Sequence, residues 1–187
     1  MSQRSYFGQL CIGIASSLLT HWVGETAAYG CTYNGPAAPS PETRIYRHLP
    51  QGFSFSIPAN YRAMGTSQGK VEFHDPNTFA FIQCEVQSNA FPELPLGTVL
   101  EVRPLPSGPN LRAQVDRARP WLSLYEPTYE SIFIGETEAL LYQYTHKILK
   151  ATIVNLAFIT ADGNSLAHLE AFAENPVIPL VQASLQL

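Results

Sequence analysis

His168 and Glu170 are the two side chains whose types and spacing point most directly to chemistry, because they lie two residues apart in a stretch that alternates like a β-strand. An imidazole and a carboxylate on one strand face can both bind a divalent metal ion, so the pair is a candidate metal site. The sheet register predicted below brings Asn155 and Tyr144 beside it. Zinc needs three or four ligands, so the alternative is that His168 and Glu170 hydrogen-bond each other or a covering helix.

A second kind of chemistry is recognition by tyrosine, of which the chain has 9. Tyrosine is common at protein interfaces because its ring packs while its hydroxyl stays hydrated. Tyr125 and Tyr129, with Trp121 nearby in sequence, are candidates for a docking patch, and the alternative for each is an ordinary half-buried position on a strand. The predicted docking or pocket face consists of Tyr142, Tyr144, Asn155, His168 and Glu170.

The signatures of several enzyme classes are missing from the sequence. There is no His-Glu-x-x-His of metalloproteases, no Cys-x-x-Cys, and no glycine-rich nucleotide-binding or phosphate loop. A site assembled from scattered residues leaves no such signature, but nothing in the sequence points to one. We therefore expect that the protein is not an enzyme. We also expect no cofactor other than the divalent metal considered for His168 and Glu170.

Composition limits the class of protein and of partner. With hydrophobic residues at 45% and charged residues at 14% of 187 residues, the chain can build one domain with a buried core. A formal net charge of -4 and the lack of any Lys/Arg-rich run argue against nucleic acid and anionic lipid headgroups as partners. We expect neither partner, and a monomer.

Residues 1–30 have the layout of a secretory signal peptide. Arg4 supplies the positive charge, and the apolar stretch from Leu10 to Val23 carries no charged residue. Polar residues within that stretch, and a length below the roughly 20 residues of a membrane span, argue against a retained anchor. Cleavage after Ala28 would release the protein, whereas a weak lipobox ending at Cys31 would attach a lipid there. The sequence predicts an exported protein.

The cysteines leave three outcomes open. Cys11 lies within the signal, so Cys31 and Cys84 remain in the exported protein. They can form a disulfide in an oxidising compartment, yet Cys84 also fits the inward face of a predicted strand as a buried free thiol. A lipid on Cys31 would prevent the bridge. Cys31 is therefore predicted as lipidated, disulfide-bonded to Cys84 or free.

The first half of the mature chain divides into a tether and the start of a domain. The stretch 31–43 is predicted as a Pro-rich, extended tether, because its composition cannot bury enough surface to fold. The domain covers 44–187. Its first elements are expected to be strands over 44–48, 52–57, 70–74 and 79–88, a turn at 74–77, a long loop over 89–109 with one potential strand at 99–102, and a helix over 111–122 capped by Asn110 and bent or ended by Pro120.

The C-terminal third carries the most regular pattern. Asp162 and Gly163 predict a hairpin turn that places Ala157 opposite His168 and Asn155 opposite Glu170. A turn at 149–150, of poorer turn chemistry, would place Tyr142 opposite Ala157 and Tyr144 opposite Asn155, and an error of one residue would move both tyrosines to the other face. The expected elements are strands over 131–134, 139–148, 152–160 and 165–173 and a short helix over 177–183 that follows Asn175 and Pro176.

Two stretches of the domain resemble a known family. The string Gly-Phe-Ser-Phe-Ser-Ile-Pro-Ala-Asn-Tyr at 52–61, followed by Val-Glu-Phe-His-Asp-Pro at 71–76, is similar to the opening of the PsbP family, the extrinsic lumenal subunits of photosystem II and their bacterial relatives. A tyrosine-rich strand at Tyr142 and Tyr144, the Asp162-Gly163 hairpin and a terminal Ser184-Leu185 follow in the same order. Tyr61 stands where the family favours Trp, and the Pro-rich stretch 89–109 does not match.

The resemblance implies a fold and a role. It implies an α+β domain in which an antiparallel sheet lies between helices, as an α/β/α sandwich. It also implies a non-enzymatic accessory or assembly protein, exported to the periplasm or thylakoid lumen and in many members lipid-anchored, that binds a membrane complex such as photosystem II. The alternative is an extracytoplasmic domain that binds a small molecule or lipid, with the predicted pocket face that carries Tyr142, Asn155 and His168 as its pocket wall.

Overall fold

The computed structural model describes residues 30–89 and 97–187 of the chain. The predicted signal peptide lies outside this part except for Gly30, and the structure leaves it as a prediction. No helix in the described ranges combines the length and apolarity needed to cross a membrane.

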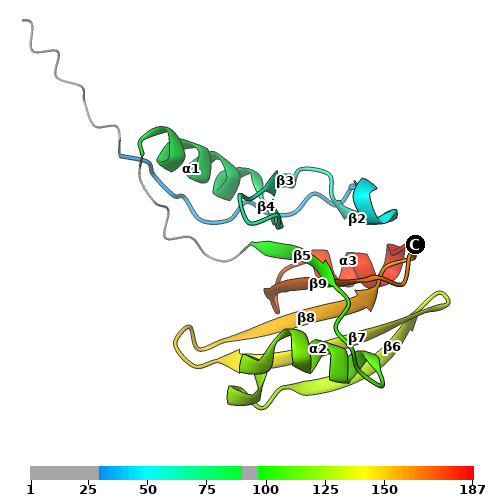
Figure 1. The fold of residues 1–187 in the computed structure, drawn as a ribbon. Coiled ribbons are helices and arrows are strands. Elements are labelled where there is room, and N and C mark those ends of the chain that lie inside the picture. The colour runs from blue at the N-terminus through cyan, green and yellow to red at the C-terminus, as the bar shows by residue number, and fades with distance from the viewer. Residues whose placement is uncertain (1–29, 90–96) are drawn as a thin grey trace, which may run out of the picture. The chain divides into compact units, whose positions relative to one another are not determined.

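A seven-stranded antiparallel sheet forms the centre of the domain (Figure 1). Its strands follow the order β3-β4-β5-β9-β8-β7-β6, and all neighbouring pairs are antiparallel. A separate two-stranded sheet pairs β1 with β2. The strands are β1 Thr43–His48, β2 Phe53–Pro58, β3 Arg62–Gly65, β4 Val71–His74, β5 Thr98–Pro104, β6 Thr128–Ile134, β7 Thr137–His146, β8 Ala151–Ile159 and β9 Ser165–Phe172.

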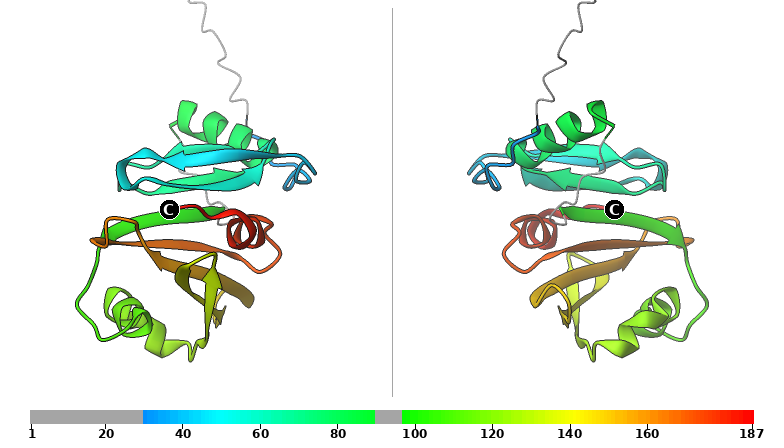
Figure 2. Two further views of the ribbon diagram at one scale, coloured as in Figure 1. Left: turned by 90° about the vertical axis from the view of Figure 1, so that its right-hand side faces the viewer. Right: turned by 90° about the vertical axis from the view of Figure 1, so that its left-hand side faces the viewer.

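Helices and the small sheet cover both faces of the large one (Figure 2). On one face lie the β1–β2 hairpin and α3, Val177–Ser184, and on the other lie α2, Leu111–Ala118, and the 3-10 helix η2, Pro120–Leu124. The third α-helix, α1, covers Pro76–Gln87 and follows β4, and a short 3-10 helix, η1, covers Leu49–Gln51 between β1 and β2. The expected fold class, an antiparallel sheet between helices, is confirmed.

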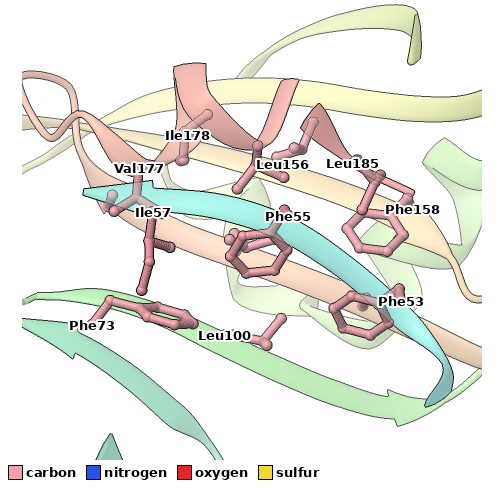
Figure 3. Close-up of a cluster of buried hydrophobic side chains, with 14 of the residues drawn as sticks. Phe53, Phe55, Ile57, Phe73, Leu100, Leu156, Phe158, Val177, Ile178 and Leu185 are labelled. Carbon is pink, nitrogen blue, oxygen red and sulfur yellow. The ribbon is translucent and has the colours of Figure 1, made fainter. Parts of the chain in front are cut away.

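The larger core lies between the sheet and the layer made by β2 and α3 (Figure 3). Phe53, Phe55 and Ile57 alternate along β2, and this spacing turns all three inward. Phe53 meets Phe158 of β8 edge to face, with ring centroids 5.3 Å apart. The C-terminus is fastened to the same strand, because Gln186 exchanges two backbone hydrogen bonds with Ser54 at 2.9 Å each.

The predicted β8–β9 register is confirmed. Ala157 lies opposite His168 and Asn155 opposite Glu170. The turn itself has four residues rather than two, because the last ladder bond joins Thr160 to Ser165, and within the loop Gly163 takes the positive φ of 68°. The next hairpin differs from the prediction by two residues: Tyr142 lies opposite Asn155 and Tyr144 opposite Ile153, so both tyrosines keep the predicted face.

The predicted strand at 79–88 is wrong, since this stretch lies in α1. Asp75 caps the helix by accepting hydrogen bonds from the backbone amides of Asn77 and Thr78, and Pro76 takes the first helical position. The predicted turn at 74–77 is therefore a helix start. Thr78 and Ile82 are the buried positions, four residues apart, which is the spacing of one helix face.

The expected long loop at 89–109 is only partly a loop. Residues 98–104 form β5, which pairs with β4 on one side and β9 on the other and is therefore a central strand. Leu100, at its middle, is 1% exposed. The helix expected after Asn110 is confirmed: the Asn110 side chain accepts from the Ala113 amide at 2.9 Å, and the helix ends just before Pro120.

The segment 31–42 is extended as expected, but it is attached to the domain rather than a free tether. A disulfide joins Cys31 to Cys84 of α1, with the two Cα atoms 5.8 Å apart. Farther along, the Ala37 amide donates to Asp75 at 2.7 Å, and the Ser40 amide donates to the Asn60 side chain at 2.9 Å. These contacts make the segment a part of the domain surface.

Candidate functional site: a buried polar face and an exposed apolar end

The sheet brings four of the five predicted face residues close together. Tyr142, Asn155 and Glu170 are neighbours across β7, β8 and β9, and His168 lies one inward-facing position along from Glu170. Tyr144 lies farther toward the β7–β8 loop on the same face, opposite Ile153. On the far side of β9, Glu101 of β5 lies opposite His168.

Arg119, which follows α2, connects these groups. One nitrogen of its guanidinium, Nη2, donates to Glu101 at 2.9 Å and to Nδ1 of His168 at 2.7 Å. The other, Nη1, lies 3.6 Å from a carboxylate oxygen of Glu170. A planar guanidinium suits this task because it presents several donors in fixed directions. The arginine thereby ties the end of α2 to two strands of the sheet.

The same contact fixes the protonation of His168. Arginine has no acceptor, so Nδ1 must be the bare nitrogen and Nε2 must carry the proton, which it donates to the hydroxyl of Tyr142. Burial lowers the pKa of His168 well below its usual value, and the charges of Arg119, Arg103 and Lys70 lower it further. His168 is therefore a neutral, structural imidazole with both ring nitrogens engaged.

This arrangement does not favour the predicted metal site at His168 and Glu170. A metal ligand needs a free lone pair, and the lone pair of His168 is occupied by Arg119. Arg119 also lies 3.6 Å from Glu170, so the same cation contacts both candidate ligands. Across 30–89 and 97–187, no group of three or more His, Cys, Asp or Glu side chains is arranged to hold a metal ion.

The predicted pocket face is closed by the layer above it. Tyr142 is 1% exposed, His168 3% and Asn155 0%, because Leu111, Val115 and Leu122 of α2 and η2 pack on this part of the sheet. Burial also raises the pKa of Tyr142. The covering helices therefore bury the central residues of the predicted face.

Two polar groups remain under-satisfied at this face. Neither the amide oxygen nor the amide nitrogen of Asn155 has a hydrogen-bond partner. Burial raises the pKa of Glu170, and the charge of Arg119 limits the rise. Glu170 reaches a small polar cleft of about 320 Å³ that it shares with Lys70, Glu72, Glu101 and Arg119.

Cys31 is bonded to Cys84 and therefore has no free thiol for a lipid. This outcome removes the predicted lipidation at Cys31 and also the predicted buried free thiol at Cys84. A disulfide of this kind is typical of proteins that work in an oxidising compartment.

Residues 65–69, Gly-Thr-Ser-Gln-Gly, match the Gly-x-Ser-x-Gly motif of hydrolases. In α/β-hydrolases the central serine sits on a turn between a strand and a helix. Here the string forms the turn between strands β3 and β4, closed by the hydrogen bond from the Thr66 amide to Lys70 at 2.8 Å. The histidine side chains of the described residues hydrogen-bond Glu72, Arg119, Tyr142 and the Leu149 amide, and none of them hydrogen-bonds Ser67.

An exposed apolar surface lies at one end of the sheet. We define the end patch as Trp121, Leu124 and Tyr125 of η2 and its C-cap with Ile148 and Leu149 of the β7–β8 loop. Ile148 is 84% exposed, Leu124 65% and Leu149 48%. The two halves are joined through Tyr125, whose ring lies 5.7 Å from that of His146 and 5.7 Å from the ammonium group of Lys147.

The sequence indicated only part of the end patch. Tyr125 and Trp121 were predicted docking candidates, whereas Ile148 was placed at the end of a strand. The signal that identifies the loop is the string Lys-Ile-Leu-Lys at 147–150, where two exposed apolar residues stand between charges. Lys150 has a positive φ of 52°, which turns the chain back toward β8.

Comparison with solved structures gives a likeness in fold. The chain is similar to the solution structure of cyanobacterial PsbP (CyanoP) from Synechocystis sp. PCC 6803, with a TM-score of 0.46 and 12% sequence identity, over 83% of this chain and 97% of that one. That protein bears the name of the family that the sequence resembles. No family model and no curated relative matches the sequence.

Proposed function

We propose that this protein is a non-enzymatic accessory or assembly factor that works outside the cytoplasm and docks on a membrane protein complex through the end patch. The observation that carries the proposal is the exposure of Ile148, Leu149 and Leu124. The rings of Trp121 and Tyr125 pack on each other, and Tyr125 links this part of the chain to the β7–β8 loop through His146 and Lys147. Aromatic and aliphatic side chains of this kind form the centres of protein interfaces.

Charge defines the kind of partner surface. Two of the three lysines in the chain, Lys147 and Lys150, flank the apolar tip, although the protein as a whole has a net charge of -4. A complementary surface would have an apolar centre and acidic groups at its rim. The sequence resemblance to the PsbP family makes photosystem II the complex to test first, in a thylakoid lumen, with a periplasmic complex as the wider class.

The disulfide supports the compartment in this proposal. A bond between Cys31 and Cys84 is stable outside the cytoplasm and is reduced within it. The buried polar face supports the absence of catalysis, because His168, its most reactive group, is neutral, fully engaged and covered. The alternative function, a ligand bound on that face, is disfavoured because Tyr142, Asn155 and His168 are buried beneath α2 and η2.

Co-purification from membranes tests the proposal. The full chain, carrying a C-terminal affinity tag, is expressed in a cyanobacterial host, and the membranes are solubilised under conditions that keep peripheral proteins bound. Photosystem II subunits are expected with the wild type and to fall at least tenfold with Ile148→Glu or Leu124→Glu. Phe133→Glu is the matched control, because Phe133 is 72% exposed but lies at the opposite end of β7, near the β6–β7 turn. Equal recovery from all variants, or no membrane complex with the wild type, would contradict the proposal.

A further inference from the structure

A cleft of about 500 Å³ opens between the N-terminal segment, the start of α1 and the β9–α3 connection. It shares no lining residue with the end patch or with the buried polar face. Its lining is rich in rings, and those that keep part of their surface exposed belong to Tyr33, Pro36, Pro39, Phe172 and Pro176. A cleft of this size and lining fits a small ligand with a largely apolar surface.

The charged lining residues of the cleft are acidic. They are Asp75 and Glu174, and none of the lysines or arginines that the structure describes is among the lining residues. Glu174 is exposed and forms no salt bridge within the described part of the chain. His74 also lines the cleft, but its Nε2 lies 2.9 Å from the Glu72 carboxylate, so a charge on this ring would be paired within the protein. The lining therefore attracts a cation and repels an anion.

Asp75 is 6% exposed and remains ionised. Although burial opposes its ionisation, hydrogen bonds from the Thr78 hydroxyl and from the Ala37, Asn77 and Thr78 amides lower its pKa. Its charge acts on the lining, because burial raises the pKa of Tyr61 and the negative charge of Asp75 raises it further. Asp75 is thus a fixed negative charge behind the wall rather than a free hydrogen-bond acceptor.

Tyr33 supplies an aromatic ring to the same cleft. Its hydroxyl lies 3.2 Å from Oγ1 of Thr78, and because the Thr78 hydroxyl donates to Asp75, the tyrosine is the donor in this contact. The Tyr33 ring also packs against Phe81 of α1, with centroids 5.3 Å apart. The ring is held in place while half-buried. The negative face of an aromatic ring attracts a cation that lies within about 6 Å of its centroid.

We propose that this cleft binds a small quaternary ammonium ion of the choline class, whose positive head lies against the ring of Tyr33 in the field of Asp75 and Glu174 and whose methyl groups pack among the proline and phenylalanine rings. Such an ion needs no hydrogen-bond acceptor, so it fits a lining whose carboxylate at Asp75 is already engaged. A neutral molecule of the same shape would gain the apolar contacts but not the attraction to the carboxylates and to the ring. The two carboxylates would also repel the phosphate of a choline lipid, so the ligand is a free ammonium ion rather than a lipid headgroup.

The disulfide holds the wall that carries Tyr33. Cys31 lies two residues before Tyr33 and is bonded to Cys84 of α1. The next part of the segment is held by the Asn77 side chain, which donates to the Gly35 carbonyl at 3.1 Å. Reduction of the disulfide therefore loosens this wall and weakens the binding.

Calorimetric titration of the oxidised full chain with choline and with 3,3-dimethyl-1-butanol tests the proposal, because the alcohol has the shape of choline with a neutral carbon in place of the charged nitrogen. Choline is expected to bind about tenfold more tightly than the alcohol. Tyr33→Leu should lower the affinity for choline about fivefold, and Glu174→Gln about threefold, while the affinity for the alcohol stays unchanged. Tyr125→Leu and Glu138→Gln are the matched controls, because both residues lie outside the cleft and have similar exposure.

Measurements on the wild type do not depend on the folding of a variant. In ¹⁵N-labelled protein, choline is expected to shift the amide resonances of Tyr33 and Phe172, and added sodium chloride should reduce this shift. Phosphocholine, the headgroup of a choline lipid, should shift them less at equal concentration, and a larger shift would overturn the assignment to a free ammonium ion. Equal affinity for choline and the alcohol, unmoved resonances at these amides, or no binding of choline would overturn the proposal and leave membrane docking by the end patch unaffected.

Discussion

Arg119 donates a hydrogen bond of 2.7 Å to Nδ1 of His168, and this contact joins the end of α2 to the middle of the sheet. This hydrogen bond can form only while Nδ1 of His168 carries no proton, so the folded structure requires a neutral His168. Protonation at Nδ1 would place a positive charge against the guanidinium inside a buried layer. Stability and protonation are therefore linked at this residue.

Acid should destabilise the protein through His168. Burial lowers the folded-state pKa of His168 below the unfolded value of 6.5, so the unfolded chain binds the proton first, and the free energy of unfolding decreases as the pH falls below 6.5. The slope approaches about 1.4 kcal/mol per pH unit. Glu170 acts in the opposite sense, because its raised pKa makes it stabilising below 4.5 and this contribution is lost as the pH rises.

Urea unfolding of wild type and His168→Gln between pH 7 and pH 5 isolates the histidine. The glutamine oxygen can accept from Arg119 and its amide can donate to Tyr142, but the side chain does not titrate. The wild type should lose more stability than the variant over this range. Parallel pH profiles would show that His168 is not the group responsible.

Removal of the charge of Arg119 should destabilise the folded protein. Arg119→Met removes a buried cationic partner of the Glu101 and Glu170 carboxylates. We expect a loss of about 3 kcal/mol, at the low end for a buried charge pair, because Lys70 and Arg103 still lie near Glu101.

A double-mutant cycle with Glu170→Gln gives the pairwise contribution. The second change removes the uncompensated charge, so it should restore part of the stability of Arg119→Met. Arg117→Met, at an exposed position on α2, should change stability by less than about 0.5 kcal/mol. Additive losses in the cycle would mean that Arg119 and Glu170 do not interact.

The sequence predicted the parts of the fold whose signals are local. The β8–β9 register followed from Asp162-Gly163 and from strict alternation on both sides. The helix α1 was mistaken for a strand, because Ala80, Ile82, Cys84 and Val86 also alternate with polar residues. In that case the cap at Asp75-Pro76 was the more informative signal.

The candidate sites were predictable to different degrees. The closeness of Asn155, His168 and Glu170 depends only on strand register, so the sequence could show it. The burial of these residues depends on where α2 ends and on the contact between Arg119 and His168 of β9. No local sequence pattern encodes either feature. The attachment of the segment 31–42 to the domain includes a disulfide that was one of three open outcomes.

Asp75 should be the more important of two helix caps. It holds the α1 amides and also the Ala37 amide and the Thr78 hydroxyl, whereas Asn110 holds one amide of α2. Asn110→Ala should cost about 1 kcal/mol, and Asp75→Ala at least about 2 kcal/mol. Denaturant unfolding of both variants measures the difference. Equal losses would mean that the bond from Asp75 to the N-terminal segment contributes nothing to stability.

The Cys31–Cys84 disulfide should contribute a large share of the stability. It closes a loop with a sequence separation of 53 residues, and the chain-entropy estimate for such a loop is about 4 kcal/mol. Reduction therefore lowers the midpoint of urea unfolding of the wild type, while Cys84→Ser should unfold at the same midpoint with and without the reducing agent. Because the bridge also holds the segment 31–42 on α1, amide exchange at Ala37 and Ser40 should become faster on reduction, whereas exchange in β8 changes only as much as global stability does. A reduced protein with unchanged midpoint and unchanged exchange at Ala37 would mean that the hydrogen bonds to Asp75 and Asn60 alone hold the segment.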